Sequence, residues 1–369
     1  MTTTRRQFIK QTGSIGALAA ATGAAANEAA STSTDGPAIT MAGYDYDRVA
    51  ALAKGKVQVE GFTTTFEKDR IGNLNTHLFN GPGTRDVSEV GIHPFMLAYA
   101  NDGFRDYTLL PIFPLRTFRH KSIFIRTDRG ITKPEDLKGR KVATPGFSSS
   151  SLTWLRGILQ HEHGVNPEDI EWYISDKDSS ASVSGSVSKQ ENVIPIGLNV
   201  RNGPKGKDES EMLADGDVDA LLHAIEPKCY LEGDPKVARL FGDFRRAEQA
   251  YFKKTGIFPI MHAVAVRKKS LEKHPELPNA LFKAYCASKQ IAYKQINEMA
   301  WAYNSLPWLA QEMEDTRKLM GDNYWPYGIE PNRKTLEAIF QYSHEQGLAK
   351  KLLTIEELFH PAALELTES

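Results

Sequence analysis

Apolar residues along this chain fall into short runs that are separated by polar turns and by stretches with helical spacing. Over residues 39–127 the pattern predicts an apolar run at 39–44, short helices at 49–52 and 73–79, and strands at 57–66, 86–92, 107–113 and 121–127. A strand at 141–144, a polar loop, a helix at 152–161 and a strand at 170–174 follow. This order implies a parallel sheet with a right-handed crossover.

The second half of the chain has a less regular pattern. Residues 175–209 are polar, with Ser and Lys runs, and predict a mobile surface with one embedded strand at 192–200. A short helix at 210–214 and a strand at 218–224 that leaves for the other lobe come next. From Pro235 onward the pattern is mostly helical, most clearly at 277–294 and 335–347, where apolar residues follow the 3.6-residue period.

The N-terminus has the features of an export signal. Residues 4–10 read TRRQFIK, with paired Arg5 and Arg6, and a short Ala- and Gly-rich segment leads to the small residues 24–26. This order predicts a twin-arginine signal peptide over 1–26, followed by a flexible linker over 27–38. The segment is too short and too weakly apolar to span a bilayer, and no later stretch predicts a membrane span in the mature chain. The mature protein is therefore expected to be periplasmic or secreted.

Charge and cysteine content exclude several classes of protein. The formal net charge is -1. The sequence has no cluster or row of basic residues that would predict binding to nucleic acid or to a membrane surface. Two cysteines, Cys229 and Cys286, are too few for a disulfide framework. We expect two buried thiols, with a single bridge in an oxidising compartment as the alternative.

Several sequence blocks resemble known families. PEDLKGRKV at 134–142, before a Ser-rich loop and helix, and ADGDVDA at 214–220 resemble segments of type II periplasmic binding proteins. A tighter resemblance, to the 4,5-dihydroxyphthalate decarboxylase family, rests on FPLRTFRH at 113–120, GIFPIMH at 256–262, WPYG at 325–328 and YSHEQGL at 342–348.

These resemblances imply a fold and an activity. The fold is an α/β type II periplasmic binding protein-like one with two lobes, each a mostly parallel sheet flanked by helices. Lobe 1 is expected to comprise 39–127 plus 225–369, and lobe 2 to comprise 128–224. The implied activity is the non-oxidative decarboxylation of a dihydroxylated aromatic carboxylate. Because that enzyme is expected in the cytoplasm, the export signal supports an alternative: a solute-binding protein that captures a small carboxylate for a membrane transporter. A sensor component is a third, weaker interpretation.

A binding site for a carboxylate is predicted from helix geometry and arginine chemistry. The loop 146–151 precedes a helix, whose first N–H groups favour an anion, and Ser148, Ser149 and Ser150 add hydroxyl donors. Arg116 and Arg119 can each offer two parallel hydrogen bonds to a carboxylate, although one of them is expected to face solvent.

The candidate acid–base groups are histidines and two glutamates. His120 and His262 lie within family blocks and are predicted as catalytic, with His93 and His223 as further candidates. Glu89 and Glu226 could accept a phenolic hydroxyl or form hinge salt bridges. No spacing of two histidines and one carboxylate predicts a metal, and no cofactor is expected, although residues far apart in sequence could still converge on a metal.

Overall fold

The computed structural model describes residues 36–179, 181–185, 187–195, 197–298 and 304–368, all within the unit Asp35–Ser369. The predicted signal peptide over 1–26 and all but the last three residues of the predicted linker lie outside the described residues. Among the helices of the described ranges, none combines the length and the apolar character that crossing a membrane requires.

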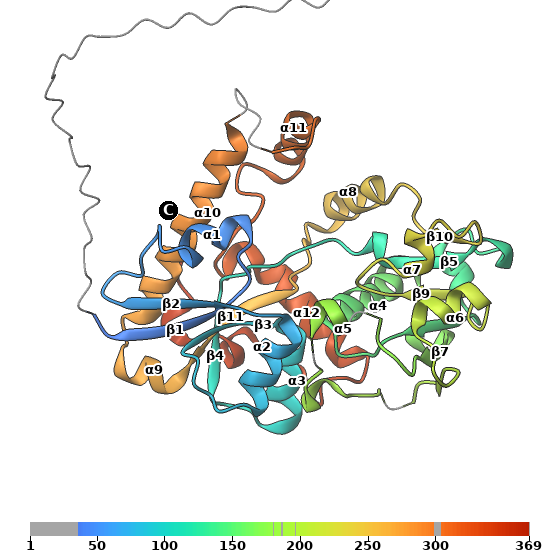
Figure 1. Ribbon diagram of the computed structural model, residues 1–369, viewed down its shortest axis with the longest axis horizontal. Coiled ribbons are helices and arrows are strands. Elements are labelled where there is room, and N and C mark those ends of the chain that lie inside the picture. Colours follow the sequence, from blue (N-terminus) through green and yellow to red (C-terminus); the bar gives the residue numbers. More distant parts are fainter. Residues whose placement is uncertain (1–35, 180, 186, 196, 299–303, 369) are drawn as a thin grey trace, which may run out of the picture. The chain divides into compact units, whose positions relative to one another are not determined.

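The first sheet has the strand order β2-β1-β3-β11-β4 (Figure 1). Its strands are β1 (Ala38–Gly43), β2 (Thr63–Lys68), β3 (Val87–Gly91), β4 (Tyr107–Leu110) and β11 (His262–Arg267). β1 is parallel to β2 and to β3, whereas β11 is antiparallel to both β3 and β4. The sheet is therefore mixed, and a strand from late in the chain lies between two early strands.

The second sheet has the order β10-β5-β9-β6-β7-β8 and is also mixed. Its strands are β5 (Ile123–Arg126), β6 (Lys141–Thr144), β7 (Glu171–Ile174), β8 (Val200–Asn202), β9 (Ala220–Leu222) and β10 (Val237–Arg239). The predicted lobe boundaries assign β5 and β10 to the first lobe, but both strands pair within this second sheet. The chain thus enters the second sheet before residue 127 and leaves it after residue 225.

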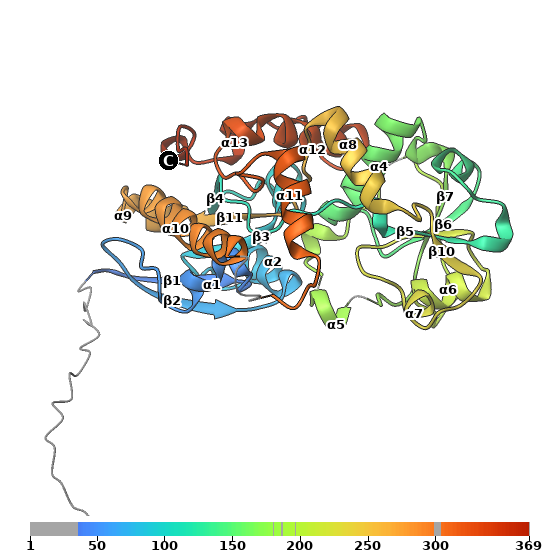
Figure 2. The same cartoon turned by 90° about the horizontal axis from the view of Figure 1, so that it is seen from above.

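Helices cover both sheets, and the larger ones follow the predicted amphipathic stretches. The helices are α1 (Asp47–Ala53), α2 (Ile71–Asn80), α3 (Ile92–Asp102), α4 (Ser150–His163), α5 (Ala181–Ser184), α6 (Glu209–Asp215), α7 (Lys228–Leu231), α8 (Phe244–Thr255), α9 (Lys268–Lys273), α10 (Leu277–Asn297), α11 (Leu309–Met320), α12 (Arg333–Glu345) and α13 (Ile355–Leu358). α1 and α10 run side by side in both views (Figures 1 and 2). The Leu52 N–H donates to Ser288 Oγ across this contact, at 3.2 Å.

One helix contributes to two hydrophobic cores, one beside each sheet. On α4, Trp154 and Ile158 pack in the core of the first sheet, whereas Leu155 and Leu159 pack in the core of the second. The indole N–H of Trp154 also donates to the Ile260 carbonyl at 2.9 Å. Burial on both sides holds the start of α4 in a defined position.

The region from Pro235 onward is mostly helical, as expected, and also contains β10 and β11. Another expectation from the sequence needs correction. The strand expected at 192–200 is instead the short β8, and the polar segment before it contains α5 and a 3-10 turn, Lys189–Glu191. Cys229 and Cys286 are free thiols, the first buried and the second half-buried.

Candidate functional site

A cavity of about 380 Å³ lies where the carboxyl ends of strands from both sheets converge. The segments that follow β1, β3, β6, β7 and β9 all line it, together with the start of the antiparallel strand β11. In open α/β sheets the carboxyl ends of parallel strands are where ligands bind. The volume is in the range of small-molecule sites.

A histidine–glutamate pair forms part of the cavity wall. Val264 on β11 is paired with Glu89 on β3, so His262, two residues earlier, lies diagonally across the same face of the sheet. His262 Nδ1 donates to Glu89 Oε1 at 2.5 Å. Glu89 is 2% exposed and His262 is 8% exposed and lines the cavity. The bond to Nδ1 leaves the Nε2 atom of His262 as the nitrogen for a ligand.

Two tyrosines complete the surroundings of Glu89. The Tyr44 N–H donates to Glu89 Oε2 at 3.0 Å and the Tyr46 hydroxyl donates to Glu89 Oε1 at 3.1 Å. Burial raises the pKa of both phenols, most strongly that of Tyr46, so both remain protonated at neutral pH. A side chain at Gly43 would approach within 2.9 Å of Glu89 Oε2, so glycine provides the room that the carboxylate needs.

The predicted anion site at the start of α4 does face the cavity. Ser148, Ser149 and Ser150 all line it, and Ser149 is the N-cap residue without capping the helix through its side chain. His93 secures the loop, because its Nδ1 donates to the Ser148 carbonyl at 2.6 Å and its backbone N–H donates to Ser150 Oγ at 3.1 Å. Burial lowers the pKa of His93 to about 3, so this histidine is neutral and acts as a support.

Of the two arginines predicted to bind a carboxylate, Arg119 lines the cavity and Arg116 does not. One of its terminal nitrogens donates to the Ala224 carbonyl at 3.0 Å, and its buried Nε has no hydrogen-bond partner within the described part of the chain. Burial lowers the pKa of Arg119 to about 10, which still leaves it charged at neutral pH. Arg119 can therefore donate to an anionic ligand.

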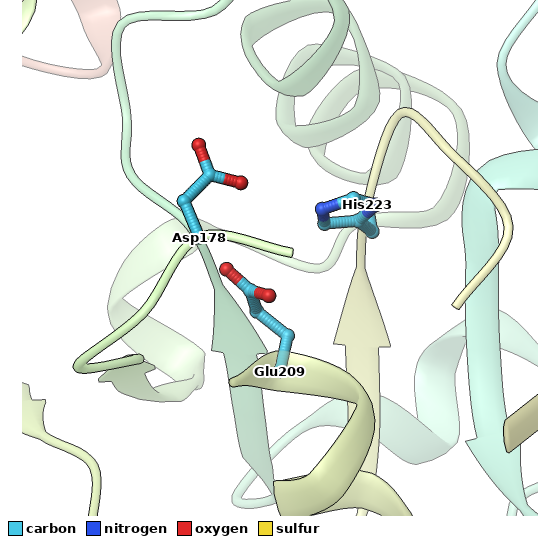
Figure 3. Close-up of side chains that lie close together, drawn as sticks. All are labelled: Asp178, Glu209 and His223. Atoms are coloured by element: carbon cyan, nitrogen blue, oxygen red, sulfur yellow. The ribbon is translucent and has the colours of Figure 1, made fainter. Parts of the chain in front are cut away.

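A third group of side chains on the cavity wall comes from the second sheet. Asp178 follows β7, Glu209 begins α6 and His223 follows β9. Their ligand atoms all lie within 4.8 Å of one another, and the side chains are directed at a common space (Figure 3). Asp178 and His223 line the cavity.

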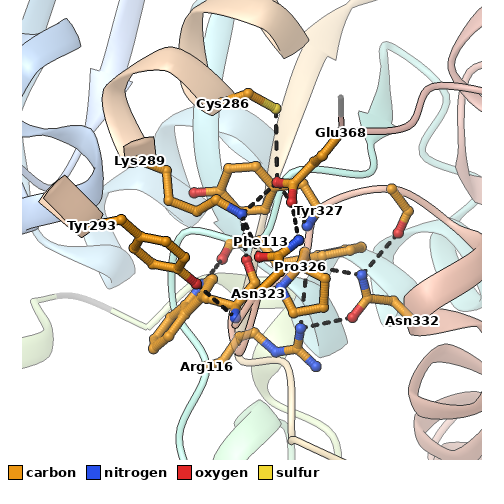
Figure 4. A network of polar contacts seen from close by, with 12 residues as sticks. Phe113, Arg116, Cys286, Lys289, Tyr293, Asn323, Pro326, Tyr327, Asn332 and Glu368 are labelled. Atoms are coloured by element: carbon orange, nitrogen blue, oxygen red, sulfur yellow. Dashed lines mark hydrogen bonds and ion pairs between the residues drawn. The ribbon is translucent and has the colours of Figure 1, made fainter. Parts of the chain in front are cut away.

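Arg116 has a different environment from the one predicted. Its guanidinium does not line the cavity and donates instead to the carbonyl of Phe258 at 2.7 Å. It also donates to Asn332 Oδ1 at 2.7 Å (Figure 4). It belongs to a buried polar network near the ion pair of Lys289 and Glu368, which lies at 2.5 Å. Arg116 thus connects the segment 325–332 to the segment before β11. Because its guanidinium does not line the cavity, it is not placed to bind a ligand there.

His120 and Glu226 also lie away from the cavity lining. The His120 ring packs against Phe241 and Tyr251, with ring centroids 5.2 and 5.3 Å away. Burial lowers the pKa of His120 to about 4. Glu226 accepts from Arg239 at 2.8 Å, which corresponds to the salt-bridge alternative for that residue.

Comparison with known proteins decides the family. The chain is 33% identical over 327 residues to a 4,5-dihydroxyphthalate decarboxylase of Comamonas testosteroni, covering 89% of this chain and 97% of the relative. It is 30% identical to a 4,5-dihydroxyphthalate decarboxylase of Pseudomonas putida, over 58% of this chain and 81% of that relative. The chain belongs to the 4,5-dihydroxyphthalate decarboxylase family.

Other similarities of this family member concern the fold. A family model described as NMT1/THI5 like matches residues 112–189. The periplasmic sulfonate-binding protein of a putative sulfonate ABC transporter from Methylobacillus flagellatus KT superposes with a TM-score of 0.56 at 14% identity, over 89% of this chain and 93% of that one. The predicted periplasmic-binding-protein-like α/β fold is thereby confirmed.

The sequence indicated part of the lining of this cavity. His262, Glu89, Arg119 and the serine loop were all candidates, and the structure brings them to one cavity or directly behind its wall. It did not find Asp178, Glu209 or the two tyrosines. Tyr44 ends the apolar run 39–44 and Tyr46 lies two residues beyond it, and this position at the end of a run was a signal that could have indicated them.

Proposed function

We propose that this chain is a carboxy-lyase that removes one carboxylate from a dihydroxylated aromatic dicarboxylate of the 4,5-dihydroxyphthalate type. The observation that carries the proposal is the buried His262–Glu89 pair, joined at 2.5 Å in the cavity wall. The names of the two curated relatives support the same reaction and substrate class.

The proposed reaction needs a proton donor beside the ring. A ring hydroxyl gives its proton to solvent water, and the resulting phenolate pushes electrons toward the carbon that bears the carboxylate. That carbon accepts a proton, and the bond to the carboxylate then breaks. Its electron pair returns to the ring as carbon dioxide leaves, and the phenolate regains a proton from solvent. In this scheme His262 Nε2 supplies the proton, and Glu89 stabilises the protonated imidazole through Nδ1.

The second carboxylate of the substrate needs its own anchor. Arg119 and the N–H groups at the start of α4 supply a positive guanidinium and unpaired donors on the same cavity. Ser148 and Ser149 add hydroxyl groups to that wall. Together they would hold one carboxylate while the other is lost, which is the positioning that the reaction requires.

A second candidate function is capture of an aromatic or other small carboxylate by an exported solute-binding protein. The predicted twin-arginine segment favours it, because that segment would deliver the folded chain to the periplasm, where a membrane transporter could receive its ligand. The sulfonate-binding neighbour shares the fold and, by its name, binds an anion. In either function, Arg119 and the start of α4 would bind the anionic group of the ligand.

Turnover separates the two functions. The purified full chain is incubated with 4,5-dihydroxyphthalate, while carbon dioxide release and the dihydroxybenzoate product are measured. We expect stoichiometric formation of both, and His262→Ala to lower kcat by about 10²-fold or more. Glu89→Gln should also lower kcat, because it weakens the support of the protonated imidazole.

Two outcomes make this test decisive. His120→Leu removes a histidine that lies outside the cavity and should retain kcat within about threefold. Absence of turnover in the native chain, together with saturable binding of phthalate by calorimetry, would reject the lyase and favour the binding protein. Full activity of His262→Ala would reject the assigned proton donor.

A further inference from the structure

We infer that Asp178, Glu209 and His223 form a binding site for one divalent transition-metal ion in the cavity wall. The three residues come from separate segments of the second sheet, at the ends of β7 and β9 and at the start of α6. One ligand atom from each lies within 4.8 Å of the others. An ion with bonds of about 2.0–2.2 Å to such atoms could bridge them after a small rotation of Asp178, which is less buried than its neighbours.

The burial of Glu209 is the independent observation that indicates a cation. Glu209 is 0% exposed and His223 is 1% exposed. Within the described residues, the donors to the Glu209 carboxylate are Ser175 Oγ at 2.6 Å and the Ser179 N–H at 3.1 Å, and both are neutral. A buried carboxylate is costly unless a positive charge or a metal compensates it. A metal ion held jointly with His223 would provide that compensation.

The surrounding hydrogen bonds orient the side chains as metal ligands. Ser175 Oγ and the Ser179 N–H donate to the two oxygens of the Glu209 carboxylate and thereby fix its orientation. His223 Nδ1 lies 2.7 Å from the Ile225 carbonyl oxygen and 3.1 Å from the Ile225 N–H. The carbonyl oxygen can only accept, so the shorter contact assigns the proton to Nδ1, and in this tautomer Nε2 carries the lone pair that a metal needs. Ser179 Oγ lies 3.4 Å from that Nε2, a weak contact that an ion would replace. Supporting contacts of this kind are typical of protein metal sites.

The ligand set indicates which metals fit. One imidazole and two carboxylates suit Mn²⁺, Fe²⁺ or Zn²⁺ better than Ca²⁺ or Mg²⁺, which prefer oxygen ligands alone. Three protein ligands leave coordination positions open, and two of the three residues line the cavity. A bound ion would therefore face the cavity ligand as well as the protein.

Metal binding can be measured without any substrate. The purified full chain, with any affinity tag removed, is titrated with Mn²⁺ while the electron paramagnetic resonance signal of free Mn²⁺ is followed. We expect saturation at one Mn²⁺ per chain, and displacement of Mn²⁺ by Zn²⁺, which binds nitrogen and oxygen ligands more tightly. Absence of saturable binding of both ions would overturn the proposal.

Matched variants locate the bound ion. Glu209→Gln and Asp178→Asn should each weaken Mn²⁺ binding by at least about tenfold. His161→Ala is the control, because it removes a histidine–carboxylate pair with Glu345, at 2.6 Å, that lies outside the cavity lining. Circular dichroism verifies that each variant is folded, and Asp178→Asn, at the less buried position, is the variant most tolerant of change.

Unchanged affinity in both carboxylate variants would reject this site even if the native chain binds Mn²⁺ elsewhere. The Mn²⁺ titration contains no aromatic carboxylate. Absence of Mn²⁺ binding would therefore not contradict the proposed decarboxylation. Conversely, absence of turnover would leave a measured metal site intact.

Discussion

At the residue scale, burial separates histidines that the sequence treats alike. His120 and His262 both occur in family blocks, but His262 lines the cavity and donates to Glu89. His120 is enclosed by aromatic rings, and burial lowers its pKa to about 4. A histidine held neutral and away from the cavity contributes to packing, whereas one with a carboxylate partner can exchange protons with a ligand.

A buried glutamate yields a prediction about pH at the same scale. Burial raises the pKa of Glu248, on α8, to about 7. The folded state then holds this proton at pH values where the unfolded chain, with a pKa of about 4.3, has released it. Stability from this group is present at low pH and is lost as the pH rises toward 7. Glu248→Gln removes the ionisable carboxyl and with it this loss of stability. We expect the substitution to raise the free energy of unfolding by about 2 kcal/mol at pH 8 and by little at pH 5.

Urea unfolding at the two pH values measures this difference. Glu168→Gln changes an exposed glutamate and is the control, for which no pH-dependent difference is expected. The same change in free energy of unfolding at pH 5 and pH 8 for Glu248→Gln would contradict the assigned titration.

At the element scale, α4 connects the cavity to both cores. The loop before α4 and its first turn supply the serines that line the cavity. The middle of α4 packs against α12 at Gly157. A Cβ atom at Gly157 would lie 2.0 Å from the ring of Tyr342, closer than any real contact. Glycine is therefore required by the close approach of the two helices, despite its low helix propensity.

Gly157→Ala tests this packing. The added methyl group must displace the Tyr342 ring or the helix, so we expect a loss of about 1–3 kcal/mol in the free energy of unfolding. Thermal and urea denaturation measure it. The double variant Gly157→Ala with Tyr342→Ala should lose less than the sum of the two single variants, because the second change removes the clash. Additive losses would show that the two helices are not in contact there.

At the scale of the whole molecule, residues far apart in sequence meet around one cavity. The segment between β7 and β8 reaches α2, where Asn75 Nδ2 donates to Glu191 Oε1 at 3.1 Å. Asn80 and Gln190 exchange two amide hydrogen bonds, at 2.9 and 3.0 Å. The described residues of this segment, which the sequence predicts to be a mobile surface, contact a helix of the first sheet and contribute to the lining of the cavity.

We expect export of the whole chain to depend on the N-terminal arginine pair. Replacing Arg5 and Arg6 by lysine keeps both charges but removes the guanidinium pair that a twin-arginine signal requires. We expect the variant to remain unprocessed in the cytoplasm, as measured by cell fractionation and immunoblotting, with the native chain exported in parallel. Export of the variant at the native level would reject the twin-arginine prediction.

Local pattern was sufficient for much of the fold. Helices α2, α4, α10 and α12 and strands β3, β6 and β7 lie where apolar spacing predicts them, because each buries one face or a short continuous run. β11 was missed. Its sequence HAVAVR is short and lies within a largely helical region, and it becomes a strand because β3 and β4 flank it. Such pairing depends on distant residues, which no local window contains.

The sequence by itself determined the family, through four separated blocks, and supplied the residue types that an anion site and a proton donor need. It also predicts the export signal, which lies outside the described residues. Only the tertiary structure decided that Arg119 and His262, and not Arg116 and His120, line the cavity, and that Glu89 stands behind His262. The physical reason is that the exposure of a side chain and its partners depend on contacts between distant segments. Glu89 and His262, for example, are 173 residues apart, and local hydrophobic spacing does not encode such contacts.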